Sequence, residues 1–240
     1  MIEIRDDAAV PNLDSLPGEL RLAQGDLKRF VELRNLYKSA IKEIATKLDI
    51  LDDEFRIRSD YTPIHSMEAR LKSIDSTVEK LQRRGLPVTL DGMRDLTDIA
   101  GIRVICNYVD DLYTMADLLL RQDDIELIAR KDYIANPKPS GYRSLHLVVL
   151  VPVFQAARTE RMPVEIQLRT IAMDTWASLE HELKYKKQGD ISEEDRDQLI
   201  ACATVLADVD ERMQEIHRRG LSEKTTEQTG EKTELPQSSK

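Results

Sequence analysis

The segment 164–169, VEIQLR, alternates apolar and polar residues. Because a strand sends successive side chains to opposite faces, Glu165, Gln167 and Arg169 would present a carboxylate, an amide and a guanidinium side by side. The apolar residues between them would face a core. The alternative interpretation is an ordinary half-buried strand with a solvated outer face, and the rest of the chain must decide between the two.

Three other groups of residues would supply the rest of a phosphate-handling site. Asp98 opens the segment 99–109, which is mostly apolar, and the loop 138–146, KPSGYRSLH, delivers tyrosine, arginine, serine and histidine into a strand. Between Arg70 and Arg84 basic residues outnumber acidic ones. Two carboxylates on neighbouring strands can hold one Mg²⁺, whose other ligands are water and substrate phosphates, and the cations can neutralise a polyphosphate.

Each group also has an ordinary structural explanation. Asp98 is also explained as a cap or turn residue, His146 as a hydrogen-bonded core histidine, and Tyr142 as a core aromatic with a satisfied hydroxyl. A basic helix is most often a solvated face. All four groups together are harder to explain by packing, because they fall in one segment with regular spacing.

Composition bounds the class of protein. The 240 residues, 41% apolar and 33% charged, suffice for one sizeable domain or two small ones. The net charge of −9 argues against a protein that coats nucleic acid, although local basic clusters can still bind phosphate. Cys106 and Cys202 fit no metal or redox spacing. The acidic first residues predict no signal peptide, and the longest apolar run, 147–154, is too short to span a bilayer, so we expect a cytoplasmic protein without membrane contact.

The elements that must position these residues alternate between helices and strands. Helices are predicted over 26–58, 66–84, 110–122, 171–187 and 192–219, a short helix or turn over 90–97, and strands over 99–109, 125–134, 145–154 and 164–169. Asp26 and Thr170 are expected N-caps, and Gly85, Gly189 and Gly220 are expected helix stops. We expect an α/β (α+β) fold with a mixed, mostly antiparallel central sheet and long helices at both ends. Residues 1–24 would be a flexible lead-in, 25–219 one domain, and 220–240 a disordered tail.

Three motifs resemble those of the RelA/SpoT synthetase domain and occur in its order. They are the segments 98–103 (DIAGIR), 140–146 (SGYRSLH) and 164–170 (VEIQLRT). The basic stretch from Arg70 to Arg83 resembles the ATP-binding helix of that family, and the resemblance covers a motif core over about 66–187. The chain has no His-Asp dipeptide and no room for hydrolase or regulatory domains. It therefore resembles a stand-alone small alarmone synthetase, which implies a nucleotidyltransferase-like fold.

The resemblance implies transfer of the β,γ-pyrophosphoryl group of ATP to the 3′-hydroxyl of GDP or GTP, with release of AMP, in stringent-response signalling. It implies Mg²⁺ as cofactor, with Asp98 and Glu165 as catalytic residues and metal ligands, Glu165 alternatively being the base. The implied ATP-binding residues are Arg70, Lys72, Lys80, Arg83 and Arg103. The implied GDP- or GTP-binding residues are Lys138, Tyr142, Arg143, His146, Gln167 and Asp174. Arg70 and Arg103 would flank the adenine, and Tyr142 would stack on the guanine.

Two positions stay open at this point. Strict alternation places Arg103 on the opposite face from Asp98, so either Asp98 precedes the regular strand or Gly101 marks a bulge. Asp174 would either accept hydrogen bonds from the guanine N1–H and N2–H₂, or serve as an acid favoured at a helix N-terminus.

The oligomeric state and the competing functions complete the expectations. The resemblance to small members of the family implies a homotetramer. The apolar stripes over 27–51 and 199–213 are consistent with a homo-oligomer, although such stripes also occur in an intramolecular core. The alternative functions are a pyrophosphokinase with another purine nucleotide as acceptor, and a nucleotide sensor or single-stranded RNA contact without turnover.

Overall fold

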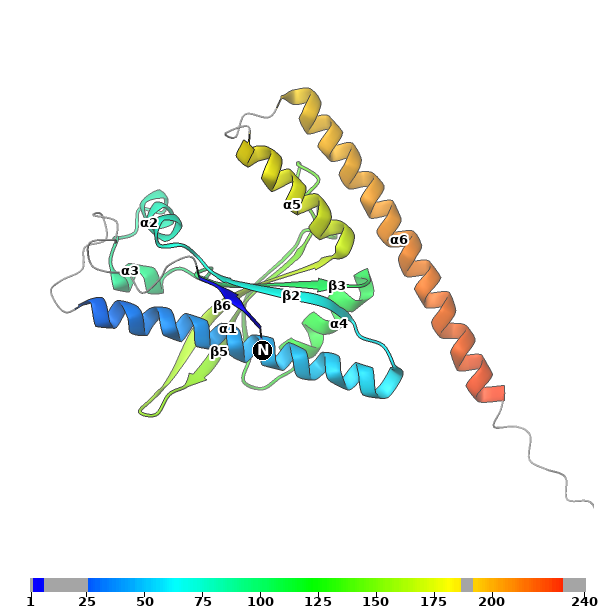
Figure 1. The fold of residues 1–240 in the computed structure, drawn as a ribbon, viewed down its shortest axis with the longest axis horizontal. Helices are drawn as coiled ribbons and strands as arrows, with labels where there is room; N and C mark the ends of the chain where they lie inside the picture. The colour runs from blue at the N-terminus through cyan, green and yellow to red at the C-terminus, as the bar shows by residue number, and fades with distance from the viewer. Residues whose placement is uncertain (1, 7–25, 187–191, 231–240) are drawn as a thin grey trace, which may run out of the picture.

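The computed structural model describes residues 2–6, 26–186 and 192–230, and a six-stranded mixed sheet lies at its centre (Figure 1). The strand order is β1-β2-β3-β6-β5-β4; β1 is parallel to β2, β3 is parallel to β6, and the other neighbours are antiparallel. The strands are β1 Ile4–Arg5, β2 Ile64–Leu71, β3 Ala100–Cys106, β4 Glu126–Asp132, β5 Leu145–Phe154 and β6 Thr159–Thr170. The predicted fold class is confirmed.

The helices divide between the two sides of the sheet. They are α1 Asp26–Ser59, α2 Ile74–Arg83, α3 Leu90–Arg94, α4 Val109–Leu120, α5 Ile171–Lys186 and α6 Glu193–Gly230. Helices α1 and α4 pack on β3 and β6, whereas α5 lies on the opposite side of the sheet from α1, with α6 packed against it (Figure 1). In the part of the chain that the structure describes, no helix is long and apolar enough to cross a membrane.

The apolar row of β6 points into the core beneath α1. Val164, Ile166 and Leu168 are at most 1% exposed, and they belong to one cluster with apolar residues of α1 such as Tyr37 and Ile41. Because this face of the strand is covered by α1, the alternate residues must point to the other face of the sheet. The polar row predicted from the alternation therefore faces the side on which α5 lies.

The helix predicted over 66–84 is wrong in its first part. The helix expected over 66–84 is the strand β2 as far as Leu71, and only α2 is helical, beginning after the N-cap Ser73. Met, Glu, Ala, Arg and Leu all favour a helix in isolation, but seven residues of β2 pair with β3 and this long-range pairing overrides the local preference.

The two ends of the chain also differ from expectation. Residues Ile4–Arg5 form β1 where the sequence predicts a loosely packed lead-in. The stop predicted at Gly220 is wrong, because α6 continues to Gly230; a glycine within an exposed helix costs only about 1 kcal/mol relative to alanine and does not by itself end a helix. Gly189 and the ranges 7–24 and 231–240 lie outside the described residues.

Candidate active site

The register of the sheet gathers the candidate residues into two rows on one face. In the first row, Arg5 of β1 lies opposite Arg70 of β2, which lies opposite Gly101 of β3, which lies opposite Glu165 of β6. Directly opposed residues on neighbouring strands point to the same face. Two arginines therefore lie on one side of a glycine that has no side chain, and a carboxylate lies on the other.

The second row is one step further along the strands. Glu68 of β2 lies opposite Arg103 of β3, Arg103 opposite Gln167 of β6, Gln167 opposite His146 of β5, and His146 opposite Lys131 of β4. The row crosses five strands, so residues from 68 to 167 in the sequence meet on one surface. Of both rows together, sequence alternation alone predicts only the two members on β6, Glu165 and Gln167.

An open cleft of about 120 Å³ lies over these rows. Arg70, Asp98, Arg103 and Glu165 line it. Strand β3 begins at Ala100 and pairs with β6 without a register shift. Its pairing with β2 shifts only at the far end, between Ile64 and Ser66, so no bulge lies at Gly101 and Asp98 precedes the regular strand. This settles the first open position, because a residue outside the strand does not follow its alternation.

Asp98 is held by two lysines of the basic stretch. Its Oδ2 accepts a hydrogen bond from the Lys72 ammonium at 3.1 Å and a second from Lys80. Burial alone would raise the pKa of Asp98, but hydrogen bonds and charge from Lys80 and Lys72 lower this pKa below its usual value. The Oδ1 atom is buried and has no hydrogen-bond partner among the described residues.

The unpartnered oxygen of Asp98 fits a Mg²⁺ ligand. Asp98 lines the same cleft as the second carboxylate, Glu165, and carboxylate oxygens are the ligands that Mg²⁺ prefers. The described residues contain no group of three or more His, Cys, Asp or Glu side chains that could hold a metal ion. The protein would thus supply these two carboxylates as ligands, and phosphates and water would complete the coordination of the metal.

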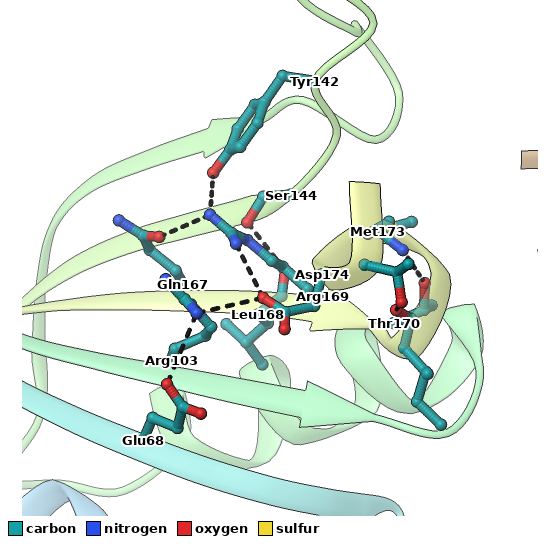
Figure 2. Close-up of polar contacts among 12 residues, drawn as sticks. Glu68, Arg103, Tyr142, Ser144, Gln167, Leu168, Arg169, Thr170, Met173 and Asp174 are labelled. Carbon is teal, nitrogen blue, oxygen red and sulfur yellow. Dashed lines mark hydrogen bonds and ion pairs between the residues drawn. The ribbon is translucent and has the colours of Figure 1, made fainter. Parts of the chain in front are cut away.

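Arg169 is the centre of a buried network beside the cleft. Its Nη2 donates to Tyr142 Oη at 2.8 Å and to Gln167 Oε1 at 3.0 Å, and its Nη1 donates to Asp174 Oδ1 at 2.9 Å (Figure 2). The Arg169 side chain is only 6% exposed. The guanidinium is therefore fixed in position, since three groups hold it and little space is left around it.

Asp174 joins this network to Arg103. The same Oδ1 that accepts from Arg169 lies 3.4 Å from Nη1 of Arg103, which in turn lies 3.6 Å from Glu68 (Figure 2). Burial first, and then the charge of Arg169, lower the pKa of Arg103, while the charge of Asp174 opposes this shift. One carboxylate in the first turn of α5 thus holds two neighbouring arginines, a role that the sequence did not indicate.

His146 lies between Tyr142 and Glu165. Its Nε2 lies 2.8 Å from Tyr142 Oη, and its Nδ1 lies 3.9 Å from Glu165 Oε1. Burial, followed by the charges of Arg169 and two lysines, lowers the pKa of His146 to about 4. The direction of the hydrogen bond between Tyr142 Oη and Nε2 is set by the His146 tautomer; when Tyr142 donates it, the ring proton is on Nδ1, which faces Glu165.

A cation lies between two tyrosines at the outer end of this network. The Lys138 ammonium is 4.6 Å from the ring centroid of Tyr133 and 4.7 Å from that of Tyr142. Tyr133 also makes edge contacts with Tyr142 and His146. Tyr133 is missing from the predicted residues; the only available signal was its position just before the predicted loop. Arg169 was visible as the last member of the polar row but was given no role.

Two predicted residues lie away from these groups. Arg143 lines a separate small cavity with Trp176 and Asp210, and Arg83 is exposed near the end of α2. The loop is pressed against α6 here: Gly141 has φ +89, and a Cβ at this position would lie 2.6 Å from that of Ala203. The predicted N-cap Thr170 is confirmed, because its Oγ1 accepts from Met173 N at 3.1 Å.

Comparisons with known proteins agree with this arrangement. A family model described as the region found in RelA / SpoT proteins matches residues 69–190, about half of the chain. The chain belongs to the RelA/SpoT family. It is 41% identical to the GTP pyrophosphokinase YwaC of Bacillus subtilis (strain 168), over 74% of this chain and 85% of that protein. It is 37% identical to the GTP pyrophosphokinase YjbM of the same organism, over 75% and 84%.

Solved structures of this family have the same fold. The small alarmone synthetase 2 of B. subtilis has a TM-score of 0.71 at 39% identity and covers 78% of this chain and 97% of its own. The small alarmone synthetase 1, bound to its product pppGpp, has a TM-score of 0.73 at 35% identity and covers 80% and 98%. The predicted family resemblance is therefore confirmed.

Proposed function

We propose that this protein is a (p)ppGpp synthetase of the stringent response. It transfers the pyrophosphoryl group of ATP to the 3′-hydroxyl of GDP or GTP: a bond forms between the 3′-oxygen and the β-phosphorus, the bond from that phosphorus to the oxygen bridging it to the α-phosphate breaks, and AMP leaves. The observation that carries the proposal is the shared cleft of Asp98 and Glu165, with three arginines, in a member of the RelA/SpoT family. Glu165 takes the proton of the 3′-hydroxyl.

The donor nucleotide occupies the side of the cleft where the cations lie. Arg70 and Arg103 flank the adenine, and both line the cleft. Lys72 and Lys80, already paired with Asp98, hold the phosphates, and Arg83 of the same helix as Lys80 meets their outer end. Asp98 and Glu165 would hold Mg²⁺, which would neutralise phosphate charge. Much of the rate enhancement then comes from positioning and charge stabilisation.

The acceptor nucleotide lies over the buried network. Tyr142 stacks on the guanine, Gln167 orients the acceptor beside Glu165, and Lys138 and His146 meet its phosphates or ribose. A contact of Arg143, which lines the separate cavity, with the acceptor stays a prediction. The hydrogen bond from Gln167 Nε2 to Glu165 Oε2, 3.0 Å long, supports the role of Gln167, because it fixes the proposed base. A direct contact of Asp174 with the guanine stays a prediction.

We also assign the protein to the cytoplasm and to a homotetrameric state. Val205, Val209 and Ile216 of α6 are 63%, 44% and 55% exposed, which supports burial of this face against another copy of the chain. Light scattering on the purified full chain would give the mass of the assembly directly. A monomeric mass would contradict the tetramer and leave the activity unaffected.

One experiment tests the activity. The purified protein is mixed with Mg²⁺, ATP labelled at the γ-phosphate and either GDP or GTP, and the products are separated by chromatography. Label on the guanosine nucleotide with an equal amount of AMP is expected. Saturable nucleotide binding without transfer would instead favour a sensor or a different purine acceptor, and a screen of other purine nucleotides would separate these.

A further inference from the structure

We propose that the N-terminal strand β1 supplies one more nucleotide-binding side chain, Arg5, to the ATP side of the cleft. The inference rests on the proposed function in one respect: it takes ATP as the ligand on that side. The sequence before α1 was expected to form only a lead-in, and it contributes nothing to the three family motifs. The structure nevertheless brings Arg5 into the lining of the cleft.

Strand pairing puts Arg5 on the functional face. β1 runs parallel to β2, with Ile4 opposite Ala69 and Arg5 opposite Arg70. Ala69 is buried and Arg70 is exposed, so Ile4 faces the core and Arg5 points with Arg70 to the cleft side. Arg5 thereby extends the row of Arg70 and Glu165 by one strand at the edge of the sheet.

The strand is held in place on both sides of Arg5. Ile2 and Ile4 pack against the hydrophobic core. Asp6 forms ion pairs with Arg34 and Lys38 of α1, and the Arg34 side chain is only 6% exposed. A charge pair that is largely removed from water fixes its backbone more firmly than a surface pair does. The position of Arg5 is therefore set by its neighbours in the chain and does not depend on the ion pair between its own side chain and Glu68.

The charges of the cleft show what Arg5 adds to it. The three arginines that line it, Arg5, Arg70 and Arg103, balance three carboxylates, Glu68, Asp98 and Glu165. Lys72 and Lys80 pair with Asp98 in addition, so Arg5 adds to a surplus of positive charge, which favours binding of a polyphosphate.

Arg5 itself remains accessible to a ligand. Its side chain is 74% exposed, and its guanidinium lies 3.8 Å from Glu68, which is 48% exposed. An exposed ion pair of this kind contributes little energy, so it does not compete strongly with a phosphate. The chemistry that suits the position is a charge-dependent contact with the triphosphate-bearing donor nucleotide.

The test measures ATP affinity separately from turnover. Calorimetric titration of ATP and Mg²⁺ into the full-length protein, without acceptor, would compare wild type with Arg5→Ala, Arg5→Lys and the control Arg58→Ala. Arg58 is a matched control, because its side chain is 77% exposed and it also pairs with a glutamate, Glu54. We expect the dissociation constant for ATP to rise roughly three- to tenfold in Arg5→Ala, to recover partly in Arg5→Lys, and to stay unchanged in the control. The difference should shrink at high salt.

The outcomes separate this inference from the proposed function. If wild type transfers label from ATP but Arg5→Ala binds ATP as tightly as wild type does, the inference is overturned and the function stands. If wild type transfers no label but Arg5→Ala binds ATP more weakly, the inference stands and the function fails. An equal loss of affinity for GDP and for ATP in Arg5→Ala would also overturn the assignment to the ATP side.

Discussion

The two halves of the site are built differently. On the proposed ATP side the charged groups line an open cleft, Arg5 and Glu68 are exposed, and the buried Oδ1 of Asp98 has no partner among the described residues. On the acceptor side Arg169 is 6% exposed and is held by Tyr142, Gln167 and Asp174. A buried hydrogen-bonded network is rigid before any ligand arrives, whereas open charges reach their final arrangement only with the polyanion they bind. The proposed acceptor half is thus the more preorganised of the two, and among the described residues of the proposed donor half only Asp98, held by Lys72 and Lys80, is fixed to a similar degree.

Glu165 belongs to both halves. It lines the cleft with Asp98, and it accepts a hydrogen bond from Gln167 of the buried network. Under the proposed function, the donor phosphate and the acceptor hydroxyl would meet at this junction. A substitution of Glu165 should therefore slow the reaction more than a substitution confined to either half of the site.

The largest effect is expected from Glu165→Gln. This change removes the charge and the proposed base while it keeps the shape of the side chain, so we expect kcat to fall by roughly a thousandfold with an unchanged melting temperature. Steady-state kinetics and thermal unfolding would measure the two quantities.

Glu160→Gln is the matched control for this prediction. Glu160 lies on the same strand, β6, but its partners are Arg94 and Arg158 rather than residues of the site. Its kcat should be close to that of wild type. A Glu165→Gln enzyme with normal turnover would remove Glu165 from the mechanism.

Tyr142→Ala should weaken binding of the acceptor nucleotide only. Loss of the ring removes the proposed stacking surface for the guanine, and we expect the KM for GDP or GTP to rise about tenfold while the KM for ATP changes little. Tyr142→Phe keeps the ring and loses only the hydroxyl contacts with Arg169 and His146, so its effect should be smaller. A defect confined to ATP would contradict the division into two halves.

Asp174→Asn should have a smaller effect, but on both halves. The amide keeps the shape and loses the charge that holds Arg103 on one side and Arg169 on the other. We expect both KM values to rise about three- to fivefold, which corresponds to about 1 kcal/mol. Asp117→Asn, on the exposed pair with Arg130, is the control. A rise in the GDP or GTP KM alone would favour the direct guanine contact over the bridging role.

The difference between the halves also explains what the sequence could predict. Strand β5 was predicted with its observed bounds, Leu145–Phe154, and the polar row of β6 was predicted from alternation alone. Both depend on a local period that matches a half-buried strand. The candidate catalytic pair, Asp98 and Glu165, came from motifs that are local in the same sense, and the structure places both in one cleft.

The parts that failed depend on contacts between distant residues. The segment 66–71 has helix-favouring residues and becomes a strand only because β3 pairs with it, so the helix prediction failed there. Arg5 reaches the cleft through pairing with a strand more than 60 residues away, and Asp174 meets two arginines through the placement of α5. No periodicity in the sequence encodes such contacts.

The smallest effect on the reaction is expected from pH, because His146 should stay neutral throughout the range in which the enzyme is assayed. Its pKa of about 4 lies below the usual value of about 6.5, so between these values the unfolded chain binds a proton that the folded chain does not. Stability must then fall as the pH decreases through this window, by about 2 kcal/mol from about pH 7 to about pH 5 as an upper limit. Denaturant unfolding of wild type and His146→Gln at the two pH values, without nucleotide or Mg²⁺, would measure it, since the variant should lose this part of the pH dependence. An NMR titration that gave His146 a pKa near 6.5 would mean that the acceptor half is wetter and less preorganised than its hydrogen bonds indicate.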